Sequence, residues 1–386
     1  MERNGKKIAI IGGSSAGLFC ALSLSRNKDL DITVFEKNDK LGKKLNATGN
    51  GHCNILPSSL EASDYNENEY MSGLFKSFSL EDLISFYKTD GIFLLNKNGL
   101  YYPYSFSAKS LNDYIYKLTS SRGVKYRLNE RLLSYSSNPS ITIKTTLGSY
   151  DFDKIVFACG GKSQPRLGSD GLLLDLFKQK GYKTREFFPT LCPVRTKEKT
   201  NSLDGKRHHG LVKLFKDNKL IYQEDGEVLF KNDGLSGIAI FNCSFYIGRE
   251  DCSKYRIVID LFPEIESFEL EKMLSLSSSS GYLSILEKEV VEYLSSLLKK
   301  EGKVVNPASL AYLSKNVVFN PAKLYPFDSS QVSSGGISLI NLNNDLSSKI
   351  ENNVYFIGEM VDINGKCGGY NLAWCLISSL LVTKSI

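Results

Sequence analysis

The sequence has few of the side chains that build metal or redox centres. It contains three histidines and one tryptophan among 386 residues, and its eight cysteines never form a C-x-x-C pair. Metal sites usually draw on closely spaced Cys and His ligands, so we expect no metal site. A chain of this length needs no disulfides for stability, so we also expect thiols that stay reduced, as in a cytoplasm.

Long hydrophobic runs are also missing. The first apolar run, residues 8–11, is too short for the hydrophobic region of a secretory signal. The last apolar run, residues 372–382, is too short to span a bilayer and contains Ser378 and Ser379. We therefore expect a cytoplasmic protein without a membrane partner.

Neither sign of charge dominates. The chain has 48 basic and 42 acidic residues, a formal net charge of +6 that is scattered along the sequence. So small an excess does not indicate a nucleic-acid partner. Hydrophobic residues make up 42% and charged residues 23%, which excludes a largely disordered chain. At about 150 residues per domain, the length predicts two or three domains.

A β-α-β unit opens the chain. Residues 6–11 and 31–36 are typical of buried strands, and residues 16–25 of the helix between them. The first turn reads Gly12-Gly13-Ser14-Ser15-Ala16-Gly17, and Glu36 ends the second strand. Glycines in this turn allow a pyrophosphate to approach the helix N-terminus, while the acid accepts bonds from ribose hydroxyls.

This dinucleotide fingerprint departs from its usual form at one position. Ser14 stands where the middle glycine is expected, and its Cβ crowds the pyrophosphate. Glu36 also argues against a 2′-phosphate, and hence against NADP, at this site.

Three later segments suit an extended anionic ligand. Residues 41–54 combine three glycines with Lys43 and Lys44, either of which could face phosphates. His52 and Cys53 in this loop invite catalytic interpretations, although a hydrogen-bonded loop residue and a buried packing residue are the simpler ones. The second segment, residues 158–161, follows a strand at 154–158. It lacks the spacing of a second fingerprint, so we expect no separate nicotinamide-binding domain.

The third segment lies near the C-terminus. A strand at residues 354–357 leads into Gly358 and Glu359, whose carboxylate suits ribityl or ribose hydroxyls. Gly368-Gly369 then precede a closing helix at residues 371–382. The helix dipole there would stabilise negative charge on the N1–C2=O edge of a reduced flavin.

The remaining elements predict a divided chain. Helices are expected at residues 80–88 and 108–120, strands at 124–135 and 140–147, strand-like runs at 192–262, and helix at 268–300 with a break at 277–281. We expect a discontinuous nucleotide-binding domain at 1–190 and 326–386. A β-rich insert at 191–262 and 306–325 and a helical subdomain at 263–305 would interrupt it.

The order of these motifs resembles bacterial FAD flavoproteins of the aminoacetone-oxidase-like or bile-acid enoyl reductase type. The resemblance runs from about residue 6 to 384 and rests on GGSSAG, LGKKLNATGNGHCN, NGLYYPYSFSAKS, FACGGKS, DGLSGIAIFN and GEMVDINGKCGGYNLAW. It implies an α/β, two-dinucleotide-binding (Rossmann-like) FAD domain with β-barrel-like and small helical inserts. It also implies that FAD is held non-covalently.

The resemblance further implies which residues line the cofactor. They are Gly12, Gly13, Ser14, Ser15, Ala16, Gly17, Glu36, Lys37, Gly42, Lys43, Lys44, Thr48, Gly49, Asn50, Gly51, His52, Cys53, Asn54, Leu132, Ala158, Cys159, Gly160, Gly161, Gly358, Glu359, Asp362, Gly368, Gly369, Tyr370, Asn371 and Leu372. Relatives in this family usually have Arg where this chain has His52.

Our hypothesis is an FAD-dependent oxidoreductase that acts on a small organic molecule. The expected reaction is NAD(P)H-linked reduction of a conjugated C=C bond, with NADH or NADPH as a transient co-substrate. Candidates for a proton donor or substrate contact are His52, Tyr102, Tyr104 and Tyr370. The alternatives are an oxygen-using amine or aminoketone oxidase, a non-catalytic flavin-binding redox module and a tRNA-modifying flavoprotein.

Overall fold

The computed structural model describes residues 5–276 and 281–386. The chain forms two compact units, one of residues Met1–Pro189 with Gln331–Ile386 and one of residues Thr190–Ser330. We had expected the divisions at residues 190 and 326, and we describe each unit by itself.

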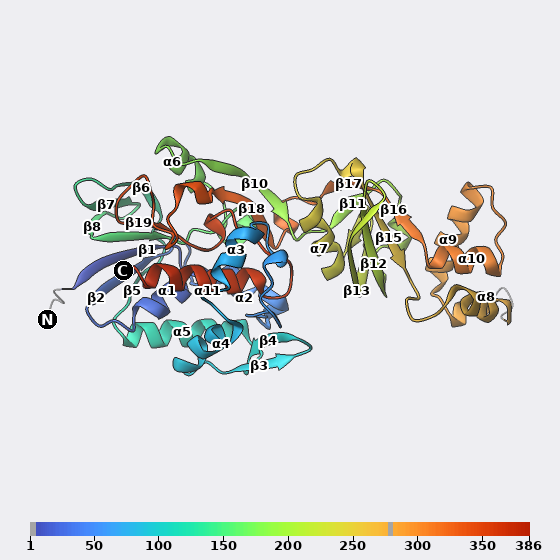
Figure 1. Cartoon of the computed structure of the whole chain (residues 1–386), viewed down its shortest axis with the longest axis horizontal. Coiled ribbons are helices and arrows are strands. Elements are labelled where there is room, and N and C mark those ends of the chain that lie inside the picture. Colours follow the sequence, from blue (N-terminus) through green and yellow to red (C-terminus); the bar gives the residue numbers. More distant parts are fainter. Residues whose placement is uncertain (1–4, 277–280) are drawn as a thin grey trace. The chain divides into compact units, whose positions relative to one another are not determined.

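A five-stranded parallel sheet lies at the centre of the first unit (Figure 1). Its order is β19-β9-β1-β2-β5, with β1 and β2 paired from Lys6 opposite Leu30 to Ile11 opposite Phe35. The strands are β1 (Lys6–Ile11), β2 (Leu30–Phe35), β5 (Lys125–Arg127), β9 (Lys154–Phe157) and β19 (Val354–Phe356). The apolar runs of β1, β2, β9 and β19 are typical of parallel strands that are covered on both faces, whereas the edge strand β5 is polar and largely exposed.

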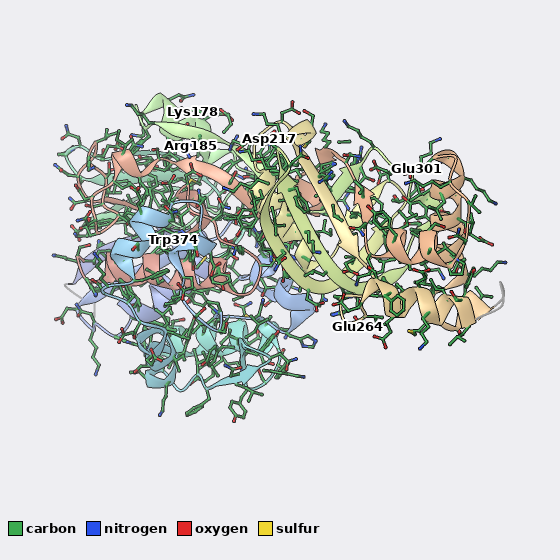
Figure 2. All side chains as sticks on the ribbon, turned by 45° about the vertical axis from the view of Figure 1, so that its right-hand side comes forward. Lys178, Arg185, Asp217, Glu264, Glu301 and Trp374 are labelled. Atoms are coloured by element: carbon green, nitrogen blue, oxygen red, sulfur yellow. The ribbon has the colours of Figure 1, made fainter. Side chains whose placement is uncertain are left out.

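Helices and small sheets surround this sheet. The helices are α1 (Ser15–Leu24), α2 (Lys43–Asn46), α3 (Asn68–Leu74), α4 (Leu80–Thr89), α5 (Ala108–Ser121), α6 (Leu173–Gln179) and α11 (Tyr370–Thr383). The other strands are β3 (Leu94–Lys97), β4 (Leu100–Pro103), β6 (Leu132–Ser136), β7 (Ile141–Thr145), β8 (Ser149–Phe152), β10 (Thr184–Thr190) and β18 (Val332–Ile337). Figure 2 shows Lys178 of α6 and Arg185 of β10 on this unit.

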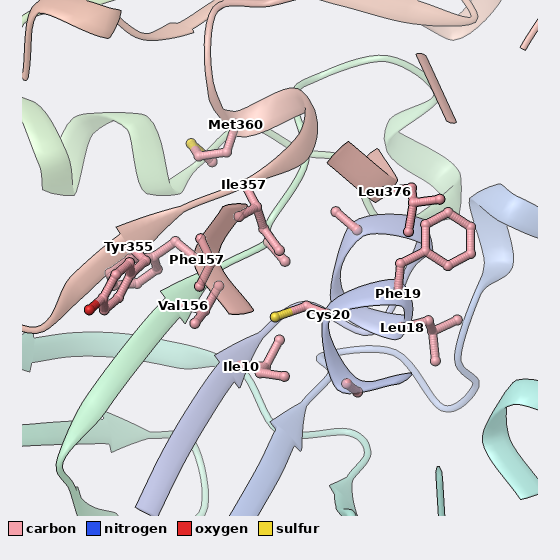
Figure 3. Packing of buried hydrophobic residues seen from close by; sticks show 14 of the residues in the cluster. Ile10, Leu18, Phe19, Cys20, Val156, Phe157, Tyr355, Ile357, Met360 and Leu376 are labelled. Carbon is pink, nitrogen blue, oxygen red and sulfur yellow. The ribbon is translucent and has the colours of Figure 1, made fainter. Parts of the chain in front are cut away.

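Helix α1 is buried along its whole length, and α11 packs beside it (Figure 1). The Ser379 hydroxyl donates to the Ala16 carbonyl at 3.1 Å, which joins the two helices. Aromatic rings pack at the ends of β9 and β19, where Phe157 and Phe356 stack with centroids 5.3 Å apart. Figure 3 shows Phe157 and Tyr355 among the buried residues of this core. The Ser379–Ala16 bond thus fixes the first turn of α1 against α11.

The second unit is built on a seven-stranded antiparallel sheet in the order β16-β15-β12-β13-β14-β11-β17. Its strands are β11 (Val194–Thr196), β12 (Arg207–Lys216), β13 (Lys219–Lys231), β14 (Gly234–Ser236), β15 (Tyr255–Asp260), β16 (Val317–Phe319) and β17 (Pro321–Leu324). Asp217 (Figure 2) and Asn218 have positive φ angles of 47° and 65°, which the tight turn between β12 and β13 requires. The helices of this unit are α7 (Ile238–Ile247), α8 (Ser267–Leu276), α9 (Lys288–Lys300) and α10 (Pro307–Ser314).

Three local predictions were wrong. Residues 238–247 form helix α7 instead of a strand, because this apolar run packs along β13. Residues 307–314 are helix α10 instead of part of the β-rich insert, since Asn306 caps a helix there through Ser309. The single strand expected at 124–135 is divided between β5 and β6, which lie in different sheets.

The break expected at residues 277–281 falls largely outside the described residues. Within the described part of the chain, none of the helices combines the length and hydrophobicity that a membrane crossing requires.

Candidate functional site

The turn between β1 and α1 is built by glycines that leave no room for a side chain. Gly12 has a φ of 110°, and a Cβ there would lie 2.4 Å from the Ala158 carbonyl oxygen. A Cβ on Gly17 would lie only 1.8 Å from the Gly12 carbonyl oxygen. Helix α1 therefore begins in close contact with β1, and its first N–H groups point toward the turn.

Ser14 fits this turn although a glycine is usual there. Its φ of −102° and ψ of −157° are ordinary extended values, so the backbone needs no glycine. Ser14 is the N-cap of α1, yet its side chain makes no capping hydrogen bond. The hydroxyl therefore remains available to a ligand at the helix N-terminus.

The Glu36 carboxylate is fixed beside this turn. One oxygen accepts the Gly13 N–H at 2.8 Å, and the other accepts the Asn38 N–H at 2.8 Å. Glu36 is buried, and each oxygen keeps a second acceptor position. This geometry suits two ribose hydroxyls, while the negative charge disfavours a phosphate at the same place. Neighbouring Lys37 instead pairs with Asp170 at 2.5 Å.

The loop of residues 42–54 turns its two lysines toward carboxylates. Lys43 pairs with Asp39 at 2.6 Å, and Lys44 pairs with Glu359 at 2.6 Å. A contact of either lysine with phosphate stays a prediction. Gly42 has a φ of 63° and lies against the Asn112 side chain, whose amide group donates to the Leu41 carbonyl at 3.0 Å.

Glu359 joins four segments of the first unit. Besides Lys44, its carboxylate accepts the Ser163 hydroxyl at 3.0 Å and the Ser333 hydroxyl at 2.7 Å. The Lys44 ammonium also donates to the Ser163 hydroxyl. Burial alone would raise the pKa of Glu359, but Lys44 and Ser333 outweigh it and hold the pKa below its ordinary value. Ser163 and Ser333 were absent from our predictions.

Residues 158–161 lie against both the first turn and this cluster. The Ala158 N–H donates to the Ile11 carbonyl at 2.8 Å, and the Cys159 thiol donates to the same carbonyl at 3.3 Å. Burial raises the pKa of Cys159. Gly160 has a φ of 70°, and a Cβ on Gly161 would lie 2.1 Å from the Ser333 hydroxyl. These two glycines are therefore required by the backbone and by the Glu359 cluster.

The C-terminal segment returns to the same region of the first unit. A Cβ on Gly358 would lie 2.6 Å from the Ala16 side chain, and one on Gly369 would lie 2.6 Å from the Leu56 backbone. Gly369, at the start of α11, thus packs against Leu56, which follows the loop of residues 48–54 in the chain. Asp362 accepts the Gly335 N–H at 2.7 Å and pairs with Arg185 at 3.1 Å.

The other expected cofactor residues of these segments have structural partners. The Asn371 side chain bonds both the N–H and the carbonyl of Gly365, each at 2.9 Å. Leu372 and Cys53 are buried, and burial raises the pKa of Cys53 to about 11. Leu132 is buried at the start of β6. Contacts of these residues with a cofactor stay predictions.

The four candidate proton donors lie in different surroundings. His52 contacts Phe106, and Tyr102 stacks on the same ring with centroids 4.9 Å apart. Tyr104 is 67% exposed. Burial, and after it the Asp64 carboxylate, raises the pKa of Tyr370. In the described part of the chain, no three His, Cys, Asp or Glu side chains group as metal ligands.

Sequence comparison agrees with this architecture. The family model for the HI0933-like protein Rossmann domain matches residues 6–385. A 3-dehydro-bile acid delta(4,6)-reductase of Clostridium scindens is 26% identical over 402 residues, which cover 98% of each chain. A ribosomal RNA dihydrouridine synthase of Escherichia coli is 25% identical over 410 residues, 97% of this chain and 98% of that one.

Structural comparison supports the fold. The 3-ketosteroid delta1-dehydrogenase of Sterolibacterium denitrificans, solved with 1,4-androstadiene-3,17-dione, has a TM-score of 0.50 at 10% identity, covering 99% of this chain and 100% of that one. At this identity the likeness concerns the fold alone. Because the family model spans nearly all of the sequence, the chain belongs to the HI0933-like Rossmann-domain family.

Proposed function

We propose that this protein reduces a carbon–carbon double bond conjugated with a carbonyl group, with NADH or NADPH as the electron donor. The names of the two relatives above describe this kind of change, since a delta(4,6)-reductase and a dihydrouridine synthase both saturate a C=C bond. The two relatives act on different classes of molecule. The shared feature is the conjugated bond, and this feature defines the proposed substrate class.

The observation that carries the proposal is the turn beside β1. Gly12 and Gly17 leave no room for a Cβ, the Ser14 hydroxyl makes no capping bond, and Glu36 is fixed beside the turn by the Gly13 N–H. These residues fit the pyrophosphate and ribose of FAD. When bound, the flavin supplies hydride transfer to the substrate. Residues 158–161, 358–359 and 368–372 surround the same region of the first unit and would hold the rest of the cofactor.

The electron donor is inferred from the described architecture. Residues 5–276 and 281–386 contain one strand–glycine turn–helix unit that ends on an acidic residue, the one at Glu36. NADH or NADPH would therefore dock transiently at the flavin instead of in a domain of its own. Glu36 gives no preference between them, because it belongs to the FAD half of the site.

Anaerobic mixing tests the proposal. The holoenzyme is mixed with NADH or NADPH, and flavin absorbance is followed at about 450 nm. We expect the absorbance to fall, and then to return when a 3-dehydro-Δ4,6-bile acid is added. Absorbance that neither nicotinamide lowers, but that an aminoketone lowers and oxygen restores, would instead establish the oxidase.

Ribosomal RNA is a second candidate substrate. The dihydrouridine synthase matches 97% of this chain at 25% identity, and the bile-acid reductase matches 98% of it at 26% identity. The two relatives are therefore about equally similar to this chain. Uridine also carries a C=C bond conjugated with a carbonyl. An unmodified ribosomal RNA transcript in place of the bile acid distinguishes the two. Our expectation that no nucleic acid binds stays a prediction until then.

A further inference from the structure

His52 is held by the backbone of a neighbouring loop. Its Nδ1 lies 3.0 Å from the Phe106 carbonyl oxygen. A carbonyl oxygen only accepts hydrogen bonds, so Nδ1 carries the proton in this pair. The other nitrogen, Nε2, then carries a hydrogen only in the imidazolium form of the ring. The His52 side chain is exposed, and no hydrogen bond within the described residues engages Nε2.

Phe106 adopts a strained conformation to make this contact. Its φ of 50° lies in the left-handed region, which bulky residues rarely adopt. The Phe106 N–H donates to the Pro103 carbonyl at 2.8 Å, and the ring stacks on Tyr102 at an interplanar angle of 15°. The His52 ring meets the Phe106 ring edge-on, with centroids 5.8 Å apart. A strained residue that other contacts hold in place points to a functional role.

We propose that His52 donates the proton that completes reduction of the double bond, and that Phe106 positions it. This inference rests on the proposed function. After hydride reaches the β-carbon, the α-carbon of the substrate carries the electron pair of an enolate. That pair forms a C–H bond as the Nε2–H bond breaks, and the N–H electron pair stays on Nε2. His52 becomes neutral, keeps its proton on Nδ1 and is reprotonated from solvent.

The position of His52 in the chain supports this role. It directly precedes buried Cys53, and Leu56, four residues further on, lies against Gly369 at the start of α11. The charged or titratable groups facing the His52–Phe106 pair are Lys97, 5.0 Å from the Phe106 ring centroid, and Tyr102. Burial raises the pKa of Tyr102, which therefore stays neutral.

Single-turnover oxidation tests the proposal. Photoreduced anaerobic holoenzyme is mixed with a 3-dehydro-Δ4,6-bile acid at about pH 6 and about pH 9, on either side of the range in which histidine changes charge. We expect wild type to react faster at the lower pH. His52→Gln should react about 10²-fold more slowly and lose this pH dependence. Rates are expressed per bound flavin, and reduction by the nicotinamide is measured separately, so that a change in FAD content does not enter the comparison.

The outcomes separate this inference from the proposed function. If neither the bile acid nor the ribosomal RNA transcript reoxidises the reduced wild-type protein, both the proposed function and the role of His52 are overturned. Active wild type together with an unchanged pH profile in His52→Gln overturns only the role of His52. His209→Gln is the matched control, because His209 is an exposed histidine of the second unit that pairs with Asp225. It should behave as wild type.

Nitrogen NMR of the holoenzyme gives a readout besides activity. Neutral His52 should carry its proton on Nδ1, and a proton on Nε2 instead would contradict the proposed geometry. Phe106→Gly keeps the left-handed backbone without strain and removes the ring. Because the backbone carbonyl stays in place, the Nδ1 proton should be retained, and loss of the ring that orients the imidazole should slow proton transfer by about tenfold while FAD stays bound.

Discussion

Single residues in the turn between β1 and α1 show why this site tolerates some changes and not others. Gly17 is required by space, because the Gly12 carbonyl occupies the position of a Cβ. Ser14, three positions earlier, has ordinary backbone angles, and its side chain makes no capping hydrogen bond. The same fingerprint therefore contains a position that only glycine fills and one where a hydroxyl replaces glycine.

Gly17→Ala should destabilise the protein by about 1–3 kcal/mol and abolish FAD binding, because α1 must move away from β1. Thermal unfolding and an FAD titration measure the two effects. Gly73→Ala is the control, since no atom lies within 4 Å of a Cβ at that position in α3. It should be stabilising by about 0.5–1 kcal/mol. Equal effects of the two variants would contradict the close approach of helix and strand.

Ser14→Ala should weaken FAD binding about tenfold, because a hydroxyl that bonds a phosphate oxygen is lost. The melting temperature of the apoprotein should stay unchanged, since the side chain makes no capping bond in the structure. Calorimetric FAD titration and apoprotein melting test this pair of expectations. A drop in apoprotein stability would show that Ser14 acts as a helix cap instead.

At the scale of elements, the Lys44–Glu359 pair joins loops that are remote in sequence. Lys44 follows β2 on helix α2, Ser163 follows β9, Ser333 lies on β18 and Glu359 follows β19. Three of these segments leave the carboxyl ends of parallel strands or their connections, where ligands of open α/β sheets bind. The pair thus joins these four segments of the chain without any bound ligand.

Lys44→Met should destabilise the apoprotein by about 3 kcal/mol at neutral pH, because it leaves the mostly buried Glu359 carboxylate without its cation. Chemical unfolding measures the difference. Lys43→Met is the matched control, since its partner Asp39 is largely exposed, and it should cost less than about 0.5 kcal/mol.

The effect of Lys44→Met should also depend on pH. The folded pKa of Glu359 is lowered, so the pair contributes stability that is present above the unfolded pKa and lost as pH falls through the folded value. The difference between wild type and variant should therefore shrink in acid, below about pH 4. A difference that is constant with pH would contradict the ion pair.

At the scale of the molecule, the residues assigned to FAD belong to one of the two compact units. The turn of residues 12–17, the loop of 42–54 and the segments after β9 and β19 all lie in residues Met1–Pro189 and Gln331–Ile386. Strands β10 and β18, which lead out of this unit and back into it, are neighbours in one small sheet. The unit has its own hydrophobic core.

Joining residues 1–189 to 331–386 by a short Gly-Ser linker should give a folded protein that binds one FAD, because the core and the proposed cofactor residues are all retained. Its absorption spectrum and a thermal melt check this. A folded but colourless product would place part of the FAD site in the second unit.

The first β-α-β unit could be predicted from the sequence because its determinants are local. Glycines that allow a tight turn, an apolar run and an acid at the end of a strand act within about forty residues of the chain. Helix α7 could not be predicted in this way, because an apolar run such as residues 238–247 suits either a strand or a buried helix until its packing partner is known.

The sequence by itself determined the nucleotide-binding fold, the place of its turn and the acid beside it, since backbone sterics and hydrophobic periodicity are properties of neighbouring residues. Only the tertiary structure decided that Lys44 pairs with Glu359, 315 residues away, and that His52 bonds the Phe106 carbonyl, 54 residues away. Such partners are chosen by which loops the sheet brings together. No spacing in the chain encodes that proximity, because it depends on the packing of every element between them.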